Sequence, residues 1–230
     1  MDTVEITRLS KYSWFEIKYH GRIIHFDPGY AGYFENQKIS EKEFEQKADL
    51  VLISHFHKDH LQPEALKRIT GPETKIIASL NCADRLEKGA VLVKPGDVIE
   101  IGAGVMVHAV DAYNTPEGHS TKKFHHRGEC VGYVLDLDGM RIYFAGDTDF
   151  IPEMRKIADV DIAFLPVGGT FTMDMGEAAC AVAAIRPRFA IPMHQLQAEL
   201  DDFKKESGIR PETEIITLKT GERKLLCGKK

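Results

Sequence analysis

The segment Ser54-His55-Phe56-His57-Lys58-Asp59-His60 directly follows the apolar run Leu50-Val51-Leu52-Ile53. An unbroken apolar run of this kind is typical of a strand that is covered on both faces. In an extended chain alternate side chains point the same way, so the first two histidines and the aspartate can converge. A turn after them lets the last histidine face the same cavity. Since imidazole and carboxylate ligate zinc and related metals, the segment predicts a metal site at a strand end.

Two later segments place further ligand-type side chains at strand ends. Ile142-Tyr143-Phe144-Ala145-Gly146-Asp147-Thr148 predicts a buried strand and a tight turn that exposes Asp147, a carboxylate that could bridge two metals. Phe189-Ala190-Ile191-Pro192-Met193-His194 predicts a strand that ends in a histidine. Taken singly, Asp147 is equally well interpreted as a helix N-cap or turn residue, and a lone histidine such as His194 is more often structural.

The remaining elements alternate along the chain. Hydrophobic periodicity and turn residues predict further strands at 4–9, 14–19, 22–26, 75–78, 91–93, 98–101, 105–110, 131–137, 140–145, 161–165 and 214–217. The strands 131–137 and 140–145 are expected to form a hairpin around Asp138-Gly139. Helices are expected at 40–47, 63–69, through Arg85 to Lys88, and at 152–158, 175–185 and 196–205. Two β-sheets covered by outer helices account for this order of elements. A chain of 230 residues suits one large domain, 1–230.

Composition excludes several classes of function. Lys and Arg total 30 against 35 for Asp and Glu, a net charge of -5, which disfavours a broad nucleic-acid binder. No apolar stretch approaches the roughly 20 residues of a membrane-spanning helix, and the N-terminus lacks the pattern of a secretory signal. A cytoplasmic protein without membrane partners is therefore expected. Neither a Gly-x-Ser-x-Gly elbow nor a phosphate-binding P-loop occurs.

Taken together, the three strand ends resemble the metallo-β-lactamase superfamily, and most closely its small metal-dependent hydrolase branch, the ascorbate-6-phosphate lactonase-like proteins. The resemblance extends from Trp14 to His194. It implies an α+β fold, the four-layer αββα sandwich of that family. It also implies a site for two divalent metal ions, with Zn²⁺ preferred and Mn²⁺ or Fe²⁺ as alternatives.

The resemblance also implies how the ligands are shared. The expected metal ligands are His55, His57, Asp59, His60, His125, Asp147 and His194. The first metal takes His55, His57 and a histidine of the loop 112–128. The second takes Asp59, His60 and His194, and Asp147 bridges the two. Asp59 is in addition the candidate catalytic residue.

The histidine from the loop 112–128 is the open choice in this set, because His119, His125 and His126 compete for it. His125 is preferred because it sits closer to the next strand. His119 in Gly118-His119 is the alternative. Asp27 falls where the family often has an acid that orients a ligand histidine, although a turn aspartate is an equally good interpretation.

The implied chemistry is hydrolysis. Two metals that share a water lower its pKa to about 7, so the bridging hydroxide is a nucleophile at neutral pH. A basic cluster of Lys122, Lys123 and Arg127, with the aromatic stretch 30–34 as a wall, suggests a small anionic ester, lactone or phosphodiester substrate. Alternatives are a nucleic-acid phosphodiesterase, an iron-dependent redox enzyme and a non-catalytic protein braced by metal. A homo-oligomer is compatible with the sequence.

Overall fold

The computed structural model describes residues 3–29, 44–102, 104–206, 209 and 211–227. The chain divides into two compact units. The first unit combines Met1–Val93 with Leu218–Lys230, and the second unit is Lys94–Thr217. The expected aromatic wall at 30–34 and residues 40–43 of the expected helix at 40–47 lie outside the described residues. That 1–230 forms one domain stays a prediction.

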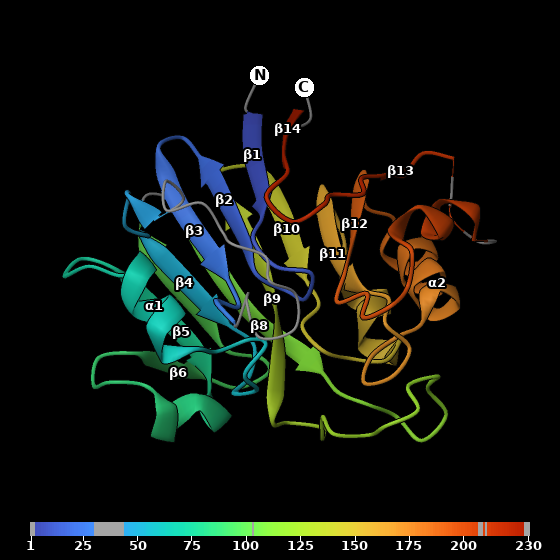
Figure 1. Cartoon of the computed structure of the whole chain (residues 1–230), viewed down its shortest axis with the longest axis horizontal. Helices are drawn as coiled ribbons and strands as arrows, with labels where there is room; N and C mark the ends of the chain where they lie inside the picture. The colour runs from blue at the N-terminus through green and yellow to red at the C-terminus, as the bar shows by residue number, and fades with distance from the viewer. Residues whose placement is uncertain (1–2, 30–43, 103, 207–208, 210, 228–230) are drawn as a thin grey trace. The chain divides into compact units, whose positions relative to one another are not determined.

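The first unit is built on a mixed sheet with the strand order β14-β1-β2-β3-β4-β5-β6 (Figure 1). Its strands are β1 (Thr3–Arg8), β2 (Phe15–Tyr19), β3 (Arg22–Phe26), β4 (Leu50–Ile53), β5 (Lys75–Ser79), β6 (Val91–Val93) and β14 (Arg223–Cys227). Strands β14, β1, β2 and β3 pair antiparallel, whereas β3, β4, β5 and β6 pair parallel. Because β3 and β4 are parallel neighbours, the residues that follow them meet at one edge of the sheet.

Strand β4 is buried at all four positions, which confirms the interpretation of its unbroken apolar run. Val51 and Ile53, two residues apart, both join a hydrophobic cluster with Trp14 and Ile69. Ile69 ends helix α1 (Pro63–Ile69), which begins at a proline as expected. Because β4 is packed on both faces, the position from which the histidine-rich segment 54–60 leaves the sheet is well defined.

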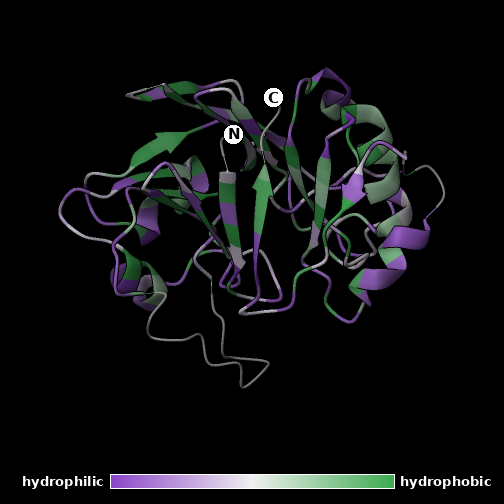
Figure 2. Cartoon of the chain, turned by 90° about the horizontal axis from the view of Figure 1, so that it is seen from above, coloured by the Kyte–Doolittle hydropathy of each residue, from purple (hydrophilic) through white to green (hydrophobic). Residues whose placement is uncertain are grey.

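The second unit contains a sheet with the order β13-β12-β11-β10-β9-β8-β7. Its strands are β7 (Val98–Gly102), β8 (Val105–Ala112), β9 (Cys130–Leu137), β10 (Met140–Phe144), β11 (Ile162–Pro166), β12 (Phe189–Met193) and β13 (Glu214–Ile215). Strands β10, β11, β12 and β13 are parallel. Their carboxyl ends therefore share one edge, where Asp147 follows β10 and His194 follows β12. Figure 2 shows hydrophobic and hydrophilic residues interleaved along the strands of both units.

Within the described part of the chain, the helices are fewer and more tightly wound than expected. Helix α2 (Met175–Ile185) matches its prediction, but three other segments are 3₁₀-helices: η2 (Leu80–Arg85), η3 (Pro152–Lys156) and η4 (Leu200–Lys205). The helix expected through Arg85 to Lys88 ends at Arg85, because Leu86 is extended directly after η2. The helix expected from Leu196 starts later because Leu196 has a left-handed φ of 50°, which no α-helix accommodates.

Strand β14 was not predicted from the sequence. It is an edge strand that pairs only with β1 among the described strands, and most of its residues are exposed. Its weak hydrophobic pattern reflects that position, because an edge strand buries little of either face. Among the described residues, no helix is both long enough and apolar enough to cross a membrane.

His25 gives the first unit a specific sensitivity to acid. Its imidazole is fully buried in β3, and Nδ1 accepts a hydrogen bond from Trp14 Nε1 at 3.1 Å. Burial, followed by the nearby charge of Lys18, lowers the pKa of His25 to about 3. The unfolded chain, with an ordinary histidine, therefore binds more protons than the folded chain between about pH 6.5 and 3.

We expect the free energy of unfolding to fall as pH drops through that window, by up to about 1.4 kcal/mol per pH unit from His25 alone. Urea denaturation at pH 7 and pH 5 measures this change in the free energy of unfolding. A His25→Gln variant, which keeps an acceptor for Trp14, loses this part of the pH dependence. The control is His108→Gln, at a partly exposed histidine of β8, which keeps it. If His25→Gln has the same pH dependence as the parent, the assignment to His25 is wrong.

Candidate metal centre

In the first unit, buried Asp27 organises the histidine-rich segment. Ser54 donates to it twice, from the backbone N to Oδ1 and from Oγ to Oδ2, both at 2.6 Å. The imidazole of His60 lies against the same carboxylate, with Nδ1 at 2.6 Å from Oδ2. Burial raises the pKa of Asp27, while His60 and Ser54 act in the opposite direction. Asp27 is therefore an orienting acid, as the resemblance implied, and not merely a turn residue.

These hydrogen bonds select the ring nitrogen that is available for a metal. Asp27 accepts from Nδ1 of His60, so the lone pair of neutral His60 is on Nε2. Ser54 Oγ uses its proton for Asp27, so it accepts from Nδ1 of His55 at 3.0 Å. The lone pair of His55 is therefore also on Nε2, which lies 2.9 Å from Nδ1 of His57. One carboxylate thus orients two imidazoles, His60 directly and His55 through Ser54, an arrangement typical of histidines that ligate metals.

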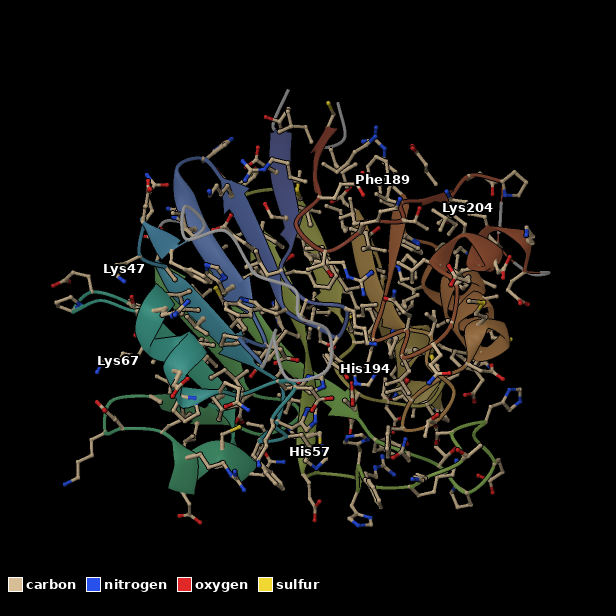
Figure 3. The ribbon with its side chains drawn as sticks, viewed as in Figure 1. Lys47, His57, Lys67, Phe189, His194 and Lys204 are labelled. Carbon is tan, nitrogen blue, oxygen red and sulfur yellow. The ribbon has the colours of Figure 1, made fainter. Side chains whose placement is uncertain are left out.

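The turn that was expected after Asp59 is present. The backbone N atoms of His60 and Leu61 both donate to the carbonyl of His57, at 2.9 and 2.8 Å. His60 is thereby brought round so that its Nε2 lies 3.7 Å from Asp59 Oδ2. The Asp59 side chain keeps 31% of its surface exposed, while His60 has none. Figure 3 shows His57 in the segment that follows β4.

In the second unit, Asp147 lies between two buried histidines. Its Oδ2 is 3.4 Å from Nε2 of His125 and 3.3 Å from Nε2 of His194. His194 leaves the end of β12 with a left-handed φ of 49° and is labelled in Figure 3. A carboxylate oxygen that faces two imidazole nitrogens is a set of donors suited to a first-row divalent metal.

The structure also separates the three competing histidines of the loop 112–128. His125 is the one buried beside Asp147. His126 is exposed, and His119 places Nδ1 2.8 Å from Asp174 Oδ2. Within this loop, His125 is therefore the histidine that lies beside Asp147, and His119 belongs to a different cluster. That His125 is a metal ligand stays a prediction.

Two residues that sequence reasoning missed orient His125. Its Nδ1 lies 3.2 Å from the carbonyl oxygen of Phe171 and 3.2 Å from Oδ1 of Asn114. A carbonyl can only accept, so Nδ1 carries the proton and Nε2 presents its lone pair toward Asp147. Asn114 also donates from Nδ2 to the Phe171 carbonyl at 2.8 Å. No local sequence pattern predicts these partners, because Asn114 and Phe171 lie 11 and 46 residues from His125 along the chain.

Buried Asp149 fixes the rest of this loop. Its Oδ2 accepts from Thr115 N at 2.8 Å and from Lys123 Nζ at 3.1 Å. A Cβ on Gly118 would lie only 2.1 Å from the same oxygen, so only glycine fits there. The ammonium of Lys123 is thus already paired with Asp149, and Arg127 pairs with Glu153 at 2.6 Å. The remaining member of the basic cluster is Lys122. Its ammonium lies over the ring of Phe171, 5.4 Å from the ring centroid.

The donor sets of both units fit divalent metals. His55, His57, Asp59 and His60 belong to groups of side chains that could hold an ion, and so do His125, Asp147 and His194. The ligand types are imidazole nitrogen and carboxylate oxygen, the set preferred by zinc and accepted by manganese and iron.

Comparison with known proteins identifies the class. Residues 5–194 match the model of the beta-lactamase superfamily domain. The chain therefore belongs to the metallo-β-lactamase superfamily. The expected metallo-β-lactamase fold, an α+β fold of the αββα type, is confirmed by this match and by the structural neighbours.

Individual relatives narrow the position within the superfamily. A "UPF0173 metal-dependent hydrolase" of Thermococcus onnurineus is 36% identical over 90% of this chain and 93% of its own length. A crystal structure from Parabacteroides distasonis, described as a candidate metal-dependent hydrolase, has a TM-score of 0.82 and 34% identity. It covers 94% of this chain and 93% of its own. A metallo hydrolase from Ignicoccus hospitalis has a TM-score of 0.80 at 25% identity, over 99% of this chain and 100% of its own. The resemblance to the ascorbate-6-phosphate lactonase-like branch stays a prediction.

Proposed function

We propose that this chain is a metal-dependent hydrolase with a dinuclear centre. His55, His57 and His125 would hold one ion, Asp59, His60 and His194 the other, and Asp147 both. The observation that carries the proposal is the pre-set lone pair on Nε2 of His55, His60 and His125, in each case because Nδ1 donates to an acceptor. The relatives named metal-dependent hydrolases support it.

When bound, the metals supply Lewis acidity that polarises the scissile group and lowers the pKa of water. The protein's part is to orient the imidazoles, which Asp27 does for His60 and Asn114 with Phe171 does for His125. Asp59 has a partly exposed carboxylate within 3.7 Å of His60 Nε2. It would take the proton of the attacking water and return it to the leaving group, which is general acid–base catalysis.

The proposed substrate is a small anionic ester, lactone or phosphodiester. Lys122 supports this choice because its ammonium lies over Phe171, whose carbonyl orients His125. Arg127 already pairs with Glu153. Lys122→Ala should therefore raise KM for an anionic substrate more than Arg127→Ala does, with little change for an uncharged ester. Equal KM values in the parent and Lys122→Ala would count against an anion-binding role.

The test of the function itself is removal and return of metal. The purified chain is treated with a chelator, reloaded with Zn²⁺, Mn²⁺ or Fe²⁺, and assayed against lactones, phosphodiesters and thioesters. We expect turnover to disappear on chelation and to return as two equivalents of metal bind. Turnover that survives complete removal of metal would refute the proposal, and turnover that consumes oxygen would indicate redox chemistry instead.

A further inference from the structure

A second group of ligand-type side chains surrounds the amino end of α2, within the second unit. It consists of His119, Asp174 and Glu177, which each present one ligand atom within 4.8 Å of the others. His119 Nδ1 lies 2.8 Å from Asp174 Oδ2. None of the three belongs to the ligand set assigned above, and His119 became available because His125 lies beside Asp147.

Helix capping explains only part of this arrangement. Asp174 is the N-cap of α2 and its Oδ1 accepts from the backbone N of Glu177 at 2.9 Å. An aspartate is expected at that position because it satisfies a free backbone N–H of the first turn. Capping needs no buried glutamate beside it and gives no reason for His119 to face the same carboxylate.

Glu177 is the member that needs a partner. Its side chain belongs to a residue only 8% exposed, and within the described part of the chain its Oε2 has no hydrogen-bond partner. A buried carboxylate oxygen without a partner is costly. Burial raises the pKa of Glu177, a hydrogen bond from the backbone of His119 lowers it, and the negative charges of Asp149 and Asp174 raise it further. Lys123 is the cation paired with Asp149, which leaves the other two carboxylates with His119.

We propose that His119, Asp174 and Glu177 form a separate binding site for a divalent first-row cation, with Zn²⁺ as the preferred ion. Imidazole nitrogen and carboxylate oxygen both ligate zinc, and three protein ligands leave the fourth tetrahedral position for water. The cation takes the place of the proton between His119 and Asp174 and gives Glu177 Oε2 its missing partner.

The spacing of the ligand atoms is compatible with this site. Ligands at 2.0–2.2 Å from a tetrahedral zinc are roughly 3.4 Å apart, so atoms within 4.8 Å of one another need only a modest approach. The side chains of His119 and Asp174 are 57% and 42% exposed, so they have room to rotate. Glu177, which is held by burial, is the fixed point of the site.

The experiment counts metal in the full chain. The parent, His119→Gln and Glu177→Gln are dialysed to equilibrium against a series of Zn²⁺ concentrations, and bound zinc per chain is measured by elemental analysis. We expect each variant to bind one zinc fewer than the parent. The matched control is His108→Gln, which removes a histidine paired with one carboxylate, Asp136, at 3.1 Å and should bind as much zinc as the parent.

Crystals of the parent soaked in Zn²⁺ provide the second measurement, an anomalous peak among the three side chains. Equal zinc in the parent and His119→Gln, with no anomalous peak at the cluster, would overturn the proposal. Because His119 is exposed, His119→Gln should fold even if Glu177→Gln does not. The difference between parent and variant is independent of turnover, so this test is separate from that of the hydrolase proposal.

Discussion

Replacing Asp59 by Ala is expected to lower hydrolytic turnover by about 10²- to 10⁴-fold, the range of a lost general acid–base group. Asp59 combines two properties within the first unit. Its Oδ2 lies 3.7 Å from Nε2 of buried His60, and its side chain is still 31% exposed. It can therefore serve as a ligand and also exchange protons with water and substrate.

The measurement is kcat and KM of the metal-loaded variant on the best substrate of the panel, together with its bound metal per chain. Asp84→Ala is the control, because Asp84 is an exposed aspartate of the same unit in η2, and it should keep full turnover. An Asp59→Ala variant with full turnover would favour a protein in which metal only braces the loops. Loss of kcat with metal still bound would instead separate the catalytic role from the ligand role.

Replacing Gly29 by Ala is expected to displace the segment that carries Asp59 and His60, and so to lower activity. A Cβ on Gly29 would lie 1.8 Å from the carbonyl oxygen of Asp59 and 2.7 Å from the backbone N of His60. Since these atoms are backbone, no side-chain rotation relieves the overlap, and the segment that carries Asp59 and His60 must move. A displacement of about 1 Å is enough to cost roughly 10²-fold in activity.

We therefore expect Gly29→Ala to lose at least about 10²-fold in kcat/KM and to bind metal more weakly. Metal titration and kinetics measure both effects. The control is Gly89→Ala in the same unit, where a new Cβ meets nothing within 4 Å but the φ of +115° makes alanine strained. Gly89→Ala should lower the free energy of unfolding but leave the affinity for metal unchanged. If Gly29→Ala binds metal as tightly as the parent, the close approach does not position the ligands.

Local sequence signals predicted much of the fold. Helix α1 begins at Pro63, and the Asp138-Gly139 hairpin turn has the two positive φ values, 46° and 96°, that its residue types favour. Such features depend on residues near one another in the chain. The edge strand β14 escaped prediction because its pairing with β1 joins segments far apart in the chain, whereas the helix expected over 196–205 was misplaced only at its start.

The sequence by itself determined the kind of donors and the places where they leave the sheets. An apolar strand followed by a cluster of histidines needs no tertiary information to indicate a metal site, because residue type and alternation define both. Tertiary structure decided which histidine of the loop 112–128 faces Asp147, and it assigned His119 to Asp174 instead. It also supplied Asn114 and Phe171 as the partners that orient His125. The physical reason is that hydrogen-bond partners are chosen by distance in space, and chain spacing does not report that distance across a long loop.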